Sequence, residues 1–202
     1  QLQIHQAQES KLAEKVHQDF EARHQVREKA LKLARALTTC SAHAIRAIHR
    51  GEVDEAEANM KEARGIVDEL NQSVVPDPEI YYSGYTQDAI KEFVEARLTI
   101  NMILDKPLAL PEDIGVEFAP YMNGLAETIG ELRRRCLDIL RHGYSDDAER
   151  LLDLMDEIYS LLVTVDYPDA ITHGLRRQTD LVRGIIERTR ADLTTSLGEQ
   201  RL

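Results

Sequence analysis

The sequence is poor in aromatic residues and cysteine, and it has no long apolar run. Aromatic residues make up 5% of the 202 positions and tryptophan is absent, so few rings besides Tyr81, Tyr82 and Tyr85 are present to stack on bases. Cys40 and Cys136 have no partner at metal-ligand spacing, which indicates buried, reduced thiols and a cytoplasmic location. No apolar run approaches the roughly 18 residues that cross a bilayer, so we expect no membrane segment.

Motifs of several enzyme classes are also missing. The chain has no glycine-rich phosphate loop, no H-E-x-x-H pair and no nucleophile elbow. Two Glu-x-x-His pairs, Glu14 with His17 and Glu21 with His24, lie on one expected helix. A carboxylate-bridged di-iron bundle needs such pairs on two facing helices, so this pattern argues against a ferritin-like oxidase.

Helical periodicity, by contrast, extends over most of the chain. Apolar residues recur at spacings of three and four, and no alternating strand pattern is present. We therefore expect an all-α, single-domain bundle of six or seven helices. Its expected parts are an extension of the first helix at 1–26, the helical domain at 27–197 and a tail at 198–202.

Glycine, proline and capping residues predict the helix ends. The expected long helices span 11–50, 54–75, 86–104, 120–143, 145–167 and 169–197, with one short helix in the connection after 104. Gly51 suits the left-handed residue that follows a helix. Asp54 and Glu57 have the spacing of a capping box, and Thr86 and Ser145 are expected N-caps.

Charge is distributed unevenly. The net charge is -11, yet residues 1–50 hold nine Lys and Arg against five Asp and Glu. Such polarity allows one surface to attract phosphate while another holds a cation. Ordinary ion pairing between a basic first helix and the acidic remainder is the alternative.

Four segments carry a resemblance to a known family. They are Lys32-Leu33, Arg35, Thr38, Ser41, Ile45 and His49-Arg50; Glu92-Phe93-Val94-Glu95-Ala96; Tyr121, Gly124, Gly130-Glu131-Leu132 and Arg134; and Leu175-Arg176-Arg177 with Asp180. In this order they resemble the translin/Trax family in its archaeal form, over about residues 27–195. Each segment alone is weakly specific, whereas the four segments in this order are fairly specific.

The resemblance implies a fold, an assembly and an activity. It implies a seven-helix chain that forms a hollow, roughly octameric homo-oligomer, in some cases with a second family member as a subunit. It further implies binding of single-stranded RNA or DNA and, for Trax-type subunits, endoribonuclease activity with Mg²⁺ (or Mn²⁺). The catalytic metal ligands carried over from the family are Glu92, Glu95, Glu127 and Glu131. The chain departs from the Trax pattern at Glu127, where that pattern has Asp.

The same carboxylates can be assessed from their spacing. Glu92 and Glu95 are three residues apart, and Glu127 and Glu131 are four apart, so each pair shares one helix face. Oxygen ligands from two helices suit Mg²⁺, which activates water and polarises a phosphate. The alternative is a solvated charged face on which Glu131 pairs with Arg134 or Arg135.

Basic residues of the first helix are the candidates for phosphate contact. These nucleic-acid-binding candidates are Arg27, Lys32, Arg35, Arg46, His49 and Arg50. Three functions therefore remain open from the sequence: a metal-dependent ribonuclease, a non-catalytic binder of single strands, and a helical scaffold without a nucleic-acid role.

Overall fold

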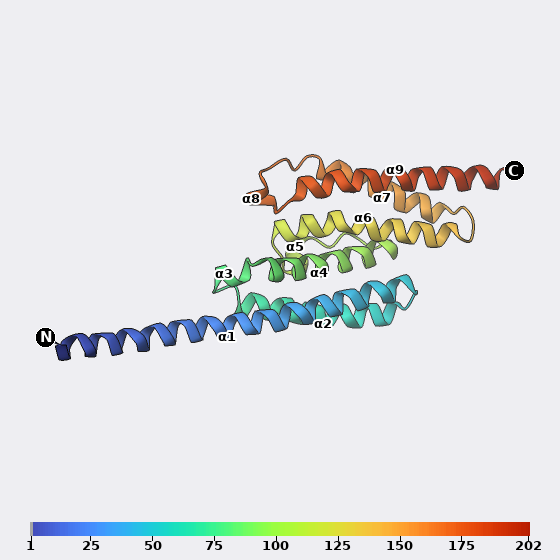
Figure 1. The fold of residues 1–202 in the computed structure, drawn as a ribbon. Coiled ribbons are helices and arrows are strands. Elements are labelled where there is room, and N and C mark those ends of the chain that lie inside the picture. Colours follow the sequence, from blue (N-terminus) through green and yellow to red (C-terminus); the bar gives the residue numbers. More distant parts are fainter. Residues whose placement is uncertain (1) are drawn as a thin grey trace.

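The computed structural model describes residues 2–202, and its regular structure is entirely helical (Figure 1). Six helices are long: α1 Leu2–His49, α2 Val53–Ser73, α4 Gly84–Ile103, α6 Phe118–Leu140, α7 Asp146–Leu162 and α9 Leu175–Gln200. Three have four residues each: α3 Pro78–Tyr81, α5 Pro111–Ile114 and α8 Asp169–Thr172. The expected all-α bundle is confirmed.

The long helices lie in pairs, with α4 and α6 at the centre (Figure 1). Helices α1 and α2 cover one side of this central pair, and α7 and α9 cover the other. The chain runs in the same direction along α1, α4, α6 and α9, and in the opposite direction along α2 and α7. The first part of α1 projects beyond the bundle, and residues 3–25 are all exposed.

Some of the expected helix ends are confirmed. Gly51 has a left-handed φ of 77° after α1, and the Ser145 hydroxyl accepts a hydrogen bond from the Asp147 amide at 3.2 Å to cap α7. The connection after α4 contains the single short helix α5, as expected.

Two predicted caps are wrong. Helix α2 begins at Val53 and has no side-chain cap, because the Glu57 carboxylate of the supposed capping box binds Arg97 at 2.9 Å. Helix α4 begins at Gly84, before Thr86, whose hydroxyl donates to the carbonyl of Ile80. In each case a contact to another segment takes the side chain that local spacing had assigned to a cap.

The last predicted helix is interrupted. We expected one helix over 169–197, whereas the structure has α8 and α9 separated by His173 and Gly174. Both residues are left-handed, with φ of 52° and 86°, which a continuous helix does not allow. Gly174 was the sequence signal for this break.

The core lies on both sides of the central pair. Phe93, Leu98 and Ile100 of α4 are fully buried, as are Leu125 and Ile129 of α6. Both cysteines are buried and unbonded, as their sequence positions predicted. Over residues 2–202, no helix has the length and apolar content to cross a membrane.

Gly124 is the point of closest approach between α4 and α6. A Cβ at Gly124 would lie 2.7 Å from the Cβ of Val94 and 2.8 Å from the backbone oxygen of Lys91. Gly130, two turns further along α6, is exposed and would meet nothing within 4 Å. Glycine is therefore required at 124 by packing and not at 130.

We expect Gly124→Ala to destabilise the fold by about 1–3 kcal/mol, because the added methyl has to push α6 away from the α4 backbone. Gly130→Ala is the matched control, and it should raise the free energy of unfolding by up to about 1 kcal/mol through helix propensity. Urea unfolding of both variants measures the difference. Equal stability of the two would contradict the close packing.

Candidate functional site

The parallel helices α4 and α6 bring the four predicted carboxylates together. Glu92 and Glu95 of α4 face Glu127 and Glu131 of α6, and all four side chains are partly buried. We call these four residues the carboxylate cluster. The side chains of Glu127 and Glu131 keep 25% and 22% of their surface exposed, so solvent and small ions can reach the cluster.

Glu95 is the most deeply placed member of the carboxylate cluster. Burial raises its pKa to about 8, and the charges of Glu127 and Glu131 together with a hydrogen bond to Glu127 add to the shift. At neutral pH the carboxyl group of Glu95 therefore holds its proton. A buried acid beside like charges is the pattern by which functional sites shift a pKa.

Glu92 lies at the side of the cluster that faces α1. Burial raises its pKa, the charge of Lys91 opposes that shift, and the charge of Glu127 adds to it. Thr38, on α1, opposes that rise in pKa and favours the ionised form of Glu92. Thr38 of the family-like first segment thus lies beside the carboxylate cluster.

Lys91 supplies positive charge inside the cluster. Its ammonium lies 3.0 Å from Glu127 Oε1 and 3.7 Å from Asp88 Oδ1. Burial lowers the pKa of Lys91, but the hydrogen bond and charge of Glu127 outweigh that effect, so the net shift is upward. Lys91 was not predicted as a site residue, because its partner is 36 positions away along the chain.

His49 lies in the cluster instead of on the exposed surface of α1. Its side chain is 3% exposed, and Nε2 is 2.5 Å from Glu131 Oε2. Its Nδ1 atom is buried and has no hydrogen-bond partner within residues 2–202. The structure thus places His49, which we had grouped with the phosphate-binding candidates, where it orients a carboxylate.

The donor set of the cluster suits a hard divalent cation. Four carboxylates offer only oxygen ligands, and the raised pKa of Glu95 indicates an excess of acidic groups in the site. The positive charge of Lys91 and the proton on Glu95 reduce the negative charge of the cluster. Within residues 2–202, no three His, Cys, Asp or Glu side chains are arranged to hold one metal ion.

Helix α9 forms a wall beside the cluster. A cavity of about 530 Å³ separates them, lined among others by Glu95, Glu127, Gln178, Leu181, Gly184 and Arg188. The Gln178 amide donates to Glu127 Oε1 at 3.3 Å, which links α9 directly to the cluster. Sequence reasoning did not identify Gln178 or Arg188, because only the packing of α9 on α6 brings them here.

The predicted basic residues of α1 divide into two groups. Lys32, Arg35 and Arg46 are exposed and form no ion pair within the described chain. Arg27 lies 3.4 Å from Glu28, and Arg50 is bound to Glu52 at 2.6 Å. Three of the candidates are thus available to an anion, whereas these two already contact neighbouring acids.

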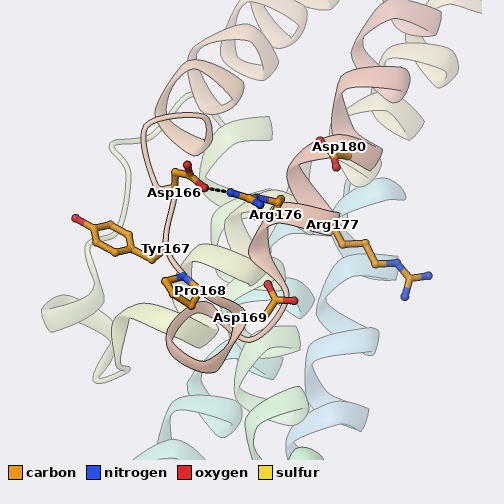
Figure 2. A pocket seen from close by; sticks show the side chains of 7 residues that line it. All are labelled: Asp166, Tyr167, Pro168, Asp169, Arg176, Arg177 and Asp180. Carbon is orange, nitrogen blue, oxygen red and sulfur yellow. Dashed lines mark hydrogen bonds and ion pairs between the residues drawn. The ribbon is translucent and has the colours of Figure 1, made fainter.

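A second cavity, of about 610 Å³, lies where the α7–α8 loop meets the start of α9 (Figure 2). Arg176 is bound to Asp166 across it, and Arg177 points away from that pair (Figure 2). Asp180 lines this cavity and also the one beside the carboxylate cluster, so the two adjoin. The family-like segment Leu175-Arg176-Arg177 with Asp180 therefore lies between them.

Comparison with known proteins identifies a sequence relative and several similar structures. No family model matches the sequence. An uncharacterised protein of Methanocaldococcus jannaschii is 34% identical over 180 residues, which cover 88% of this chain and 79% of that protein.

The solved structures that resemble the chain include AfC3PO and NeC3PO. AfC3PO in complex with duplex RNA is 34% identical and superposes with a TM-score of 0.86, covering 93% of this chain and 97% of that chain. AfC3PO alone gives a TM-score of 0.87, also at 34% identity, with 94% and 99% covered. Apo-NeC3PO is 17% identical with a TM-score of 0.83 and coverage of 91% and 96%, a likeness of fold alone.

Proposed function

The chain belongs to the translin/Trax family, and from that premise we propose that it binds single-stranded RNA or DNA and cleaves RNA with Mg²⁺ or Mn²⁺ held by Glu92, Glu95, Glu127 and Glu131. The observation that carries the proposal is the carboxylate cluster itself. Four acids from two helices meet in a partly buried site and offer the oxygen ligands that a hard cation prefers.

Binding of nucleic acid is supported from two directions. AfC3PO, at 34% identity over nearly the whole chain, has been solved with duplex RNA. In this chain Lys32, Arg35 and Arg46 are exposed and unpaired within the described residues, and together with Arg50 they lie within one sector of α1 about 27 Å long. That surface adjoins the Thr38 side of the carboxylate cluster.

The residues of the cluster have distinct chemical roles in this proposal. When bound, Mg²⁺ would neutralise phosphate charge and lower the pKa of a coordinated water. Glu95, whose pKa is about 8 in the cation-free site, would release its proton when it becomes a ligand, because a coordinating carboxylate is ionised. His49 holds Glu131 in position, and the Lys91 ammonium places positive charge near an approaching phosphate.

Glu127 is the departure from the Trax pattern. Its carboxylate is held by Lys91 and Gln178 at 3.0 and 3.3 Å, so the longer side chain is anchored from both α4 and α9. A ligand at this position does not require the shorter Asp if these contacts direct its oxygens into the cluster. The rival function, a non-catalytic binding protein, would use the same basic surface without a metal.

We expect the pure protein to cleave labelled RNA with Mg²⁺ and not with EDTA, and Glu95→Gln to slow cleavage more than about a hundredfold. Even residues that only support a metal ligand contribute roughly 10- to 100-fold. Glu95→Gln should bind RNA as well as the wild type, because it removes no positive charge. Arg35→Ala should weaken binding and lower the salt dependence of log K by about one unit.

Glu127→Asp serves as the matched variant, since it keeps the charge and restores the Trax residue. It should retain cleavage. Cleavage by Glu95→Gln at the wild-type rate would remove the catalytic assignment, and binding without any cleavage would support the non-catalytic rival. Absence of salt-dependent RNA binding would leave only a scaffold role. Single-stranded and duplex RNA are assayed in parallel.

We further propose that the chain forms a closed homo-oligomer. Large apolar side chains are exposed on the single chain, among them Phe118 at 75%, Ile171 at 62% and Tyr167 at 59%. Exposed apolar surface of this kind typically marks contacts between proteins. Light scattering of the pure chain should return a multiple of 23.0 kDa, and a mass of 23.0 kDa at micromolar concentration would contradict the assembly.

A further inference from the structure

Arg188 is a cation on the α9 wall of the cavity beside the carboxylate cluster. It lines that cavity with Glu95 and Glu127, yet no ion pair or hydrogen bond within the described residues involves its guanidinium. Arg190 binds both oxygens of Asp156 and Arg133 binds Asp192 at 2.8 Å, whereas Arg183 and Arg188 of α9 are exposed and, of these two, only Arg188 lines the cavity. An arginine left unpaired beside several acids has its hydrogen-bond donors available to a ligand.

The Arg188 side chain lies over Gly184. Side chains on a helix lean towards its N-terminus, so Arg188 reaches back over the preceding turn. Gly184 occupies that turn, and a Cβ there would be 3.4 Å from Arg188 Nη1. That distance is an ordinary van der Waals contact, so the guanidinium lies close over this turn, and both residues line the cavity.

The chemistry of this position fits an anion. A guanidinium presents paired donors that match two phosphate oxygens, and it stays charged at every relevant pH. A phosphodiester that approaches the carboxylate cluster is repelled by its negative charge. Arg188 offsets that repulsion from α9, and α9 and α1 lie on opposite sides of the central pair α4 and α6 (Figure 1).

We infer that Arg188 binds a backbone phosphate of the nucleic acid and holds the strand across the carboxylate cluster, between α1 and α9. The inference rests on the proposed function, because it assigns part of the substrate to the same site. Arg188 is a positioning residue here: it contacts the phosphate that adjoins the reacting one, while the cluster carries the chemistry. Gln178, bound to Glu127, lies on the same wall.

The test is binding of a short labelled oligouridylate in EDTA, where no cleavage occurs. Arg188→Gln should raise the dissociation constant about tenfold, the loss expected from one charge-assisted contact, and lower the salt slope by about one. Arg188→Lys should recover part of the affinity because it restores the charge. Arg183→Gln is the matched control, since Arg183 is exposed on the same helix and lines neither cavity.

A kinetic readout separates positioning from catalysis. With Mg²⁺, Arg188→Gln should raise KM for RNA with little change in kcat. Wild-type protein that fails to bind RNA would overturn both the proposed function and this inference. If the wild type binds RNA and Arg188→Gln binds it as tightly as Arg183→Gln does, this inference alone would be overturned. Circular dichroism measures whether each variant is folded. If Arg188→Gln does not fold, the comparison of Arg188→Lys with the wild type still tests the inference.

Discussion

Helix α6 packs closely on α4 at Gly124, because the absence of a side chain there leaves room for the Val94 side chain and the Lys91 backbone oxygen. The carboxylate cluster depends on this contact. Glu127 follows Gly124 by one turn, and Glu95 follows Val94 directly, so the approach of the two backbones sets how near the acids lie. Helices α4 and α6 run parallel, and Glu131 lies one turn after Glu127 on α6. Glu131 therefore also lies near Glu95. A packing constraint at one glycine thus sets the spacing of the four carboxyl groups.

Four acids at such close range repel one another, and the surrounding structure reduces the cost. Lys91 neutralises Glu127, His49 binds Glu131, and the Glu95 carboxyl keeps its proton. These compensations come from α1 and α4 themselves, while α9 adds only the amide of Gln178. The α9 side of the site therefore remains open as a cavity, and Arg188 lies there without a protein partner in the described chain.

The helices could be predicted because they depend on local spacing, whereas the four acids were identified by the resemblance to the family pattern. Pairs at i,i+3 and i,i+4 had to share a helix face, and the family pattern related the two faces to one site. The partners could not be predicted in this way. Lys91 with Glu127, His49 with Glu131 and Glu57 with Arg97 each join different helices, so only helix packing reveals them. The failed capping box has the same cause, since Glu57 is engaged by Arg97.

The most direct test of the account is the pH dependence of unfolding, with and without Mn²⁺. A raised carboxyl pKa means that the folded state keeps a proton which the unfolded state has released. Between pH about 4.5 and 8, stability should therefore fall as pH rises, by at most about 1.4 kcal/mol per pH unit from Glu95. Glu95→Gln should remove this component, and Mn²⁺ should stabilise the wild type at pH 8 far more than the variant. Identical pH profiles for the two proteins, or equal stabilisation of both by Mn²⁺, would contradict a cation site built on the carboxylate cluster.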